Sequence, residues 1–141
     1  ARPMELWLTL RARAQAALDA MAWLPPLLLR VTLGVVFFST GLGKVQNLDK
    51  VTAFFTELGI PLPALHAVVV GYTELVGGAL LVAGLASRLA AVPLAVSMLV
   101  AVLTAKRAEI TGVADFFGLL EVAYLVMLVA VAVGGAGAVS L

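Results

Sequence analysis

Long apolar stretches dominate the chain. Four of them, each 17–20 residues long, carry at most one charged residue: residues 24–43, 67–86, 89–105 and 116–133. As helices rising 1.5 Å per residue they would cover roughly 25–30 Å, which matches the hydrocarbon core of a bilayer. Because lipid offers the backbone no hydrogen-bond partners, each stretch must satisfy its own backbone groups as a helix. The pattern predicts an all-α fold, a bundle of four transmembrane helices within residues 24–141.

Two other segments show a weaker helical pattern. In residues 1–23, Leu6, Leu10 and Ala17 fall on one side of a helix, while Trp7 and Trp23 suit the aromatic belt at a membrane surface. We therefore predict an N-terminal amphipathic helix there. This segment has no continuous apolar core of the kind that marks a cleavable signal peptide.

The connection between the first two predicted spans contains a second amphipathic pattern. Apolar residues recur at helical spacing over 45–58, Asn47 can cap the start, and Gly59 followed by two prolines ends the segment. We predict a short helix lying in the membrane interface.

The composition supports a membrane protein. Hydrophobic residues make up 63% of the chain and charged residues 12%, against about 45–50% and about 25% in an average soluble domain. The net charge of +1 and the lack of a basic run argue against a nucleic-acid partner. Membrane lipid is the expected environment.

The chain has no cysteine and one histidine, His66. Disulfides, dithiol redox chemistry and thiolate metal sites are therefore excluded. One histidine cannot by itself build a zinc or haem site of the usual kind. We predict no metal site and no covalently bound cofactor.

The basic residues are distributed slightly unequally between the two sides of the predicted bundle. Five lie on or near the N-terminal side: Arg2, Arg11, Arg13, Arg30 and Arg88. Four lie on the other: Lys44, Lys50, Lys106 and Arg107. By the positive-inside rule, we expect a multi-pass protein with both termini in the cytoplasm.

Charged residues interrupt three of the four stretches. An ionisable side chain near the centre of a bilayer costs roughly 2.5–3.5 kcal/mol. On the first stretch, Arg30 shares one helical stripe with Gly34, Gly41 and the following Lys44. Glycines allow helices to approach closely in a membrane, so we expect this stripe to face the interior of the bundle.

The second stretch repeats the arrangement. Glu74 shares a stripe with Gly78 and Arg88, and Gly77 lies beside it. Glu74 falls roughly 10 Å and Glu121, on the fourth stretch, roughly 8 Å in from the same side of the membrane. Arg30, about 9 Å in from the other side, is placed to reach toward them. We predict a polar cluster inside the membrane, made of Arg30, Lys44, Glu74, Arg88 and Glu121.

Two interpretations of this cluster remain open. In one, Arg30 or Lys44 pairs with Glu74 and only fixes the register of the helices. In the other, the charged groups line a pocket that binds a quinone headgroup, relays protons or holds another ligand. A metal site is a weaker third option, because the Glu-x-x-His pairs of di-iron bundles are missing.

The order of these residues resembles the DoxX family of small four-helix bacterial membrane proteins. The resemblance covers residues 27 to about 133 and rests on LLLRVTLGVVFFSTGLGKV, GIPLP and TELVGGALLVAGLASR. It includes Arg30, Lys44, Glu74 and Arg88. It also includes five glycines that we expect to pack the helices together: Gly34, Gly41, Gly77, Gly78 and Gly84.

The resemblance implies a protein of the bacterial cell inner membrane with a link to quinone or redox chemistry. The family is named after subunits of a thiosulfate:quinone oxidoreductase. Related four-helix families that perform thiol redox chemistry carry cysteine pairs, which this chain lacks.

We therefore expect an accessory subunit rather than an enzyme acting alone. It would anchor an oxidoreductase complex, bind other membrane or redox subunits, and lie near a quinone. One alternative is a small proton-coupled transporter or ligand-binding membrane protein, with Pro93 as a helix break. Another is a purely structural or assembly protein.

Overall fold

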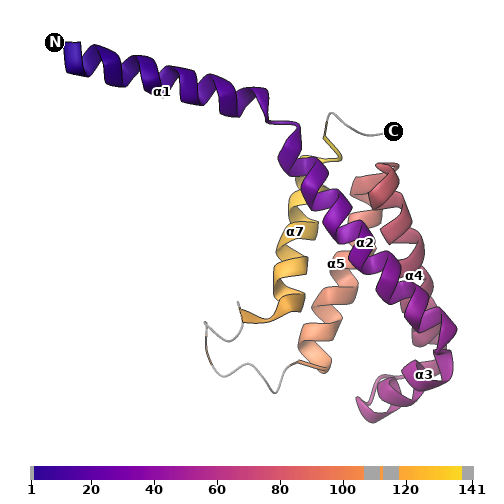
Figure 1. Ribbon diagram of the computed structural model, residues 1–141. Helices are drawn as coiled ribbons and strands as arrows, with labels where there is room; N and C mark the ends of the chain where they lie inside the picture. Colours follow the sequence, from indigo (N-terminus) through magenta and orange to yellow (C-terminus); the bar gives the residue numbers. More distant parts are fainter. Residues whose placement is uncertain (1, 107–111, 113–117, 138–141) are drawn as a thin grey trace.

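The computed structural model describes residues 2–106, 112 and 118–137 of the chain (Figure 1). These residues form helices and the turns between them, so the all-α prediction is confirmed. The helices are α1 (Arg2–Ala20), α2 (Leu24–Gln46), α3 (Leu48–Glu57), α4 (Pro63–Ala83), α5 (Ser87–Thr104) and α7 (Leu120–Gly134).

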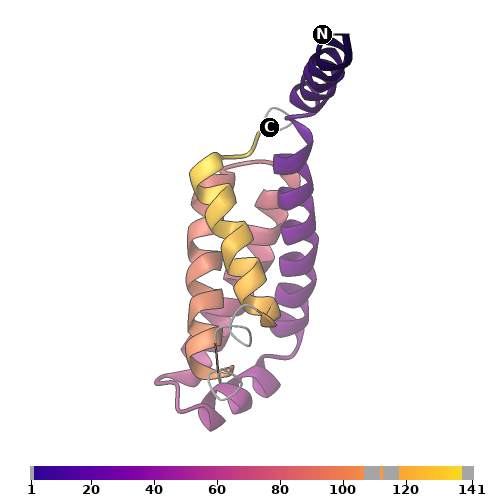
Figure 2. The same cartoon turned by 90° about the vertical axis from the view of Figure 1, so that its left-hand side faces the viewer.

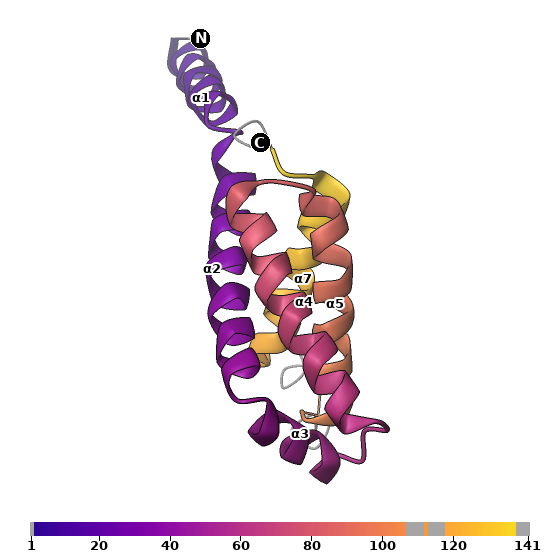
Figure 3. The same cartoon turned by 90° about the vertical axis from the view of Figure 1, so that its right-hand side faces the viewer.

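Four helices pack side by side as a bundle. Helix α2 packs against α4, α4 against α5, α5 against α7, and α7 against α2, with successive helices running in opposite directions (Figures 2 and 3). Helix α3 lies across one end of the bundle and packs on α4. Helix α1 leaves from the other end. These two ends are called the α3 end and the α1 end below.

Three helices, α2, α4 and α5, are long and apolar enough to cross a membrane. Helix α7 is apolar but has only 15 residues. It begins at Leu120 rather than at residue 116, and residues 116 and 117 lie outside the described part of the chain. The outer faces of the bundle carry exposed large apolar side chains such as Leu28, Val35, Val92 and Leu103, as expected of a surface solvated by lipid.

Prolines and glycines move the helix boundaries away from the predicted ones. Helix α4 starts four residues early, at Pro63, because proline is tolerated in the first turn, where its missing N–H would have no partner. It ends at Ala83 because Gly84 adopts a left-handed conformation with φ 75°. Gly84, which was predicted to pack helices, is buried and forms the C-cap of α4.

The predicted interfacial helix is present as α3, but its start differs in detail. Asn47 holds the N-cap position without a capping hydrogen bond from its side chain. Its amide instead donates to the carbonyl of Gly43, at 2.8 Å. Asn47 therefore ties α3 back to the last turn of α2.

Glycines bring the backbones of α2 and α4 into direct contact. A Cβ atom on Gly34 would lie 2.8 Å from the carbonyl oxygen of Gly78, and one on Gly41 would lie 2.7 Å from the carbonyl carbon of Glu74. Both distances are shorter than real Cβ atoms tolerate. Gly77 makes a similar contact between α4 and α5, since its Cβ would meet Leu94 of α5 at 3.0 Å. This is the small-residue packing that membrane helices use where lipid supplies no hydrophobic drive for association.

Replacing Gly41 by alanine should separate α2 from α4. The new methyl group meets the α4 backbone, and overpacking of this kind costs roughly 1–3 kcal/mol. We expect Gly41→Ala to lower the melting temperature of the purified protein in detergent, followed by circular dichroism.

The matched control is Gly43→Ala in the same helix. A Cβ there has no atom within 4 Å, so only the gain in helix propensity, up to about 1 kcal/mol, remains. Equal melting temperatures for the two variants would contradict the close α2–α4 contact.

Candidate functional site

Glu74 is a carboxylate inside the bundle. It lies on the face of α4 that carries Gly71, Gly78 and Leu81, and only 1% of its surface is exposed. An ionised side chain at such a position needs a cation and hydrogen bonds to offset the loss of solvation. The structure supplies both from α2.

Lys44 and Thr40 each bind one oxygen of the Glu74 carboxylate. The Lys44 Nζ lies 2.6 Å from Oε1, and the Thr40 hydroxyl lies 2.9 Å from Oε2, to which it can donate. The same hydroxyl is 3.2 Å from the Phe37 carbonyl. Thr40 and Lys44 are four residues apart, so one face of α2 presents both groups to α4. We call Thr40, Lys44 and Glu74 the carboxylate cluster.

Glycines shape the space around the cluster. The Cβ of Lys44 lies 3.4 Å from where a Cβ on Gly71 would be, so the lysine stem runs directly over the α4 backbone. Gly41 lies between Thr40 and Lys44 and touches the backbone of Glu74 itself. A larger residue at either glycine would move the two cluster helices apart.

The cluster is open on one side. Glu74 is sealed, but 31% of the Lys44 side chain is accessible, and Thr40 is exposed. A molecule approaching from outside the bundle would therefore meet the side chains of Lys44 and Thr40 before the carboxylate.

Arg30 and Arg88 lie elsewhere. Arg30 is buried, but it donates from Nη1 to the carbonyl of Ala136, at 2.9 Å. Ten residues of α2, about 15 Å along the helix axis, separate it from Thr40. Arg88 is exposed and donates to the carbonyl of Val133, at 3.1 Å. Arg88 thus binds the last turn of α7 and Arg30 the segment that follows it, both at the α1 end, so the expectation that Arg30 reaches toward Glu74 is wrong.

Glu121 is also separate from the cluster. It lies in the first turn of α7, about one-quarter of its side chain is exposed, and it forms an ion pair with Lys106, at 3.8 Å. Its depth was overestimated because α7 begins at Leu120. Of the five predicted residues, the structure therefore brings together Lys44 and Glu74, while Arg30, Arg88 and Glu121 make other contacts.

His66 takes no part in the cluster. It is partly exposed, and its Nδ1 lies 3.1 Å from the carbonyl of Leu62 one turn earlier. Within the described part of the chain, no group of three or more His, Asp or Glu side chains could hold a metal ion.

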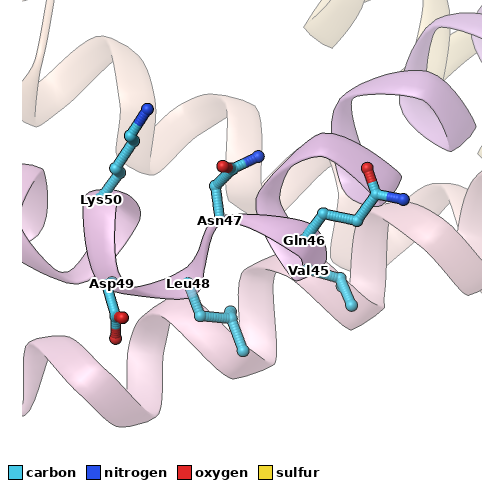
Figure 4. Close-up of a pocket in the computed structure, with 6 residues that line it drawn as sticks. All are labelled: Val45, Gln46, Asn47, Leu48, Asp49 and Lys50. Atoms are coloured by element: carbon cyan, nitrogen blue, oxygen red, sulfur yellow. The ribbon is translucent and has the colours of Figure 1, made fainter.

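An open hollow of about 370 Å³ lies beyond Lys44, where α2 passes into α3. It is lined by one continuous run of residues, Val45 to Lys50, whose side chains spread in different directions (Figure 4). Because all of its lining comes from the end of α2 and the start of α3, this hollow is a surface depression at the α2–α3 junction.

Thr40 is the member of the cluster that sequence reasoning missed. A hydroxyl on an apolar helix gives no charge signal. Its spacing of four residues before Lys44 is the pattern that could have revealed it.

Comparison with known proteins places the chain in a family. The family model described as DoxX matches residues 26–107, more than half of the chain. The chain belongs to the DoxX family. The match includes α2, α3, α4 and α5, and with them every residue of the carboxylate cluster.

Two relatives are similar to this DoxX protein over most of its length. The "Putative oxidoreductase CatD" of Bacillus subtilis is 38% identical over 105 residues, which are 74% of this chain and 73% of that protein. The "Uncharacterized membrane protein Rv3486" of Mycobacterium tuberculosis is 34% identical over 101 residues, 67% of this chain and 62% of that protein. No solved structure matches the chain significantly.

The ion pair of this DoxX protein should respond unequally to the loss of its two partners. Lys44→Met leaves the Glu74 charge sealed in the bundle, at a cost of roughly 3–5 kcal/mol. Glu74→Gln preserves hydrogen bonds to Thr40 and Lys44, and the freed ammonium retains its access to the exterior. We expect a loss near 1 kcal/mol for this variant, measured by unfolding in detergent.

Glu121→Gln is the control, because it removes a longer and more exposed ion pair. Such a pair contributes at most about 1 kcal/mol. If Lys44→Met were no more harmful than Glu121→Gln, the carboxylate cluster would not be a stabilising ion pair.

Proposed function

We propose that this DoxX protein is a non-catalytic membrane subunit that anchors an oxidoreductase complex and lies next to the quinone pool. The proposal rests on one observation above all. The carboxylate cluster offers hydrogen-bond donors and charge, but the chain has no cysteine and a single histidine. Electrons would therefore have to be carried by a partner.

The name of the relative from Bacillus subtilis supports this reading, because it describes that protein as an oxidoreductase. The membrane setting supports it as well. In the proposed arrangement α7 is the fourth span, and both termini lie in the cytoplasm of a bacterial cell. The basic residues favour that orientation over the reverse by five to four.

The open side of the cluster suits a quinone headgroup. Quinone carbonyl oxygens accept hydrogen bonds, and the Lys44 ammonium has three N–H groups, of which Glu74 engages one. Glu74 would hold the Lys44 ammonium in place, since its two oxygens are already engaged. A bound quinone would supply the electron acceptor for the partner. The role of this chain would be to hold and orient the headgroup.

Purification from native membranes in a mild detergent tests the anchor role. We expect the tagged protein to carry a partner with flavin or metal absorbance. A lone homo-oligomer with neither a redox partner nor bound quinone would contradict the proposal.

Thr40→Val tests the quinone role, since it removes the hydroxyl that holds Oε2 of Glu74 beside the Lys44 ammonium and leaves the Lys44–Glu74 pair in place. We expect less quinone in solvent extracts of the purified protein, measured by chromatography. The control is Thr52→Val, which removes a hydroxyl that binds only the Leu48 carbonyl within α3. Equal quinone content in both variants would argue against a headgroup site at the cluster.

One alternative is supported by a specific observation. A sealed carboxylate behind a partly accessible lysine is also an arrangement found in proton-coupled transport. In that case Glu74→Gln should abolish proton-coupled flux in liposomes while the protein remains folded. If Arg30→Ala and Glu74→Ala only lower protein abundance, a structural or assembly role is favoured over both.

A further inference from the structure

Helix α1 stands apart from the rest of the protein. All its described residues are exposed, and none is buried against another helix. It leaves the α1 end sideways, across the direction of α5 and α7 (Figure 1), and is seen nearly end-on in Figures 2 and 3. Most of the stability of a helix in a protein comes from packing of one face, so a surface that covers one face of this 19-residue helix would stabilise it.

The apolar side chains of α1 gather on one face. At about 100° per residue, an arc of about 120° contains no polar residue. Going around the helix, its members are Leu6, Ala17, Leu10, Pro3, Ala14, Trp7 and Leu18. The four largest of these, Leu6, Trp7, Leu10 and Leu18, each expose more than half of their surface. Met4 and Leu8 lie outside the arc and are also exposed, and nothing in the structure explains their positions.

The charges of α1 are sorted around this arc. Arg11 lies about 20° beyond the Leu18 edge, and Arg13 lies about 20° beyond the Leu6 edge. The two acidic residues, Glu5 and Asp19, are each about 100° from the nearest apolar edge, on the opposite side of the helix. Cations thus flank the apolar face and anions point away from it.

We propose that α1 lies flat on the membrane, with its apolar arc among the acyl chains and its flanking arginines on lipid phosphates. Long arginine side chains can lay their stems along apolar surface and extend their heads to the phosphate level. Glu5 and Asp19 then face water. The arrangement is that of interfacial helices, whose binding combines apolar burial with attraction to anionic headgroups.

Two features favour lipid over a protein groove as the cover of this face. The Arg11 guanidinium lies over the Trp7 ring, 5.4 Å from its centre, a pairing suited to the headgroup layer, where tryptophan is enriched. Arg2, Arg11 and Arg13 form no ion pair with a carboxylate of the described chain. Burying such charges in a protein interface would carry a large desolvation cost unless that interface supplied acidic partners.

The lipid surface is also continuous with the bundle. Trp23 stands just before α2 and is exposed, and Leu28 on the next turns is exposed as well. The apolar arc of α1 and the lipid-facing side of α2 can therefore meet one membrane at its edge. This inference is independent of the proposed redox role.

Tryptophan fluorescence of the full chain in vesicles tests the proposal. The chain has two tryptophans, so Trp23→Phe leaves Trp7 as the sole reporter. We would reconstitute it in phosphatidylcholine and phosphatidylglycerol, with lipids brominated near the headgroup end of the acyl chain. We expect strong quenching of Trp7 by the brominated lipid and weak quenching by aqueous acrylamide.

Two other outcomes would overturn the proposal. Quenching by acrylamide alone would place α1 in water. Protection from both quenchers would mean that protein, such as a second copy of the chain, covers the apolar face.

Charge variants separate the arginines from the apolar arc. Arg11→Gln with Arg13→Gln should at least double the acrylamide quenching of Trp7. Glu5→Gln with Asp19→Asn removes the same number of charges from the opposite face and should not increase it. Each variant is compared with itself in non-brominated lipid, so changes in the intrinsic emission of Trp7 cancel. Equal responses of the two pairs would refute the phosphate contacts.

Discussion

The close approach of α2 to α4 is the constraint on which the rest of the structure depends. In a bilayer, two helices gain little by hiding apolar surface from each other, so association must come from dense packing and polar contacts. Gly34, Gly41 and Gly78 remove the side chains that would hold these backbones apart. Because the helices touch, the short side chain of Thr40 and the longer one of Lys44 can both reach the same carboxylate. Glu74 can thus be charged at a depth where a lone charge would not be tolerated.

The bundle divides its polar groups between its two ends. Toward the α3 end, the carboxylate cluster joins α2 to α4, and the pair of Lys106 and Glu121 joins α5 to α7. At the α1 end, two arginines from different helices bind carbonyls at the end of α7. Between these ends the core is apolar, with Leu33, Phe37, Leu94 and Leu128 fully or almost fully buried. Chemistry on a ligand could therefore be confined to one end without disturbing the contacts that close the other.

The sequence was most informative where charge and glycine coincide. The charged residues that share a helix face with glycines correctly predicted that Lys44 and Glu74 face the interior. A charged side chain that faced lipid would have a high free-energy cost, so few other arrangements are possible. The prediction for Arg30 failed because the position of a residue around a helix indicates the direction of its side chain but does not identify its partner. The carbonyl that Arg30 binds belongs to Ala136, which follows α7. Thr40 was overlooked because a hydroxyl on an apolar helix carries no charge that would mark it as buried in the bundle. Helix ends shifted by a few residues where Pro63 and Gly84 overrode the hydropathy boundary.

The contacts of the two arginines have a consequence for how the protein is made. The hydrogen bond between Arg30 and Ala136 joins residues 106 positions apart, and that between Arg88 and Val133 joins residues 45 positions apart. During synthesis, α2 and α5 therefore reach the translocon long before these carbonyls exist. The segment from Val133 to Ala136 supplies the partners of both arginines, so these contacts form only after α7 has been made. A chain truncated before α7 would present two incomplete arginine sites to the quality-control proteases of the membrane.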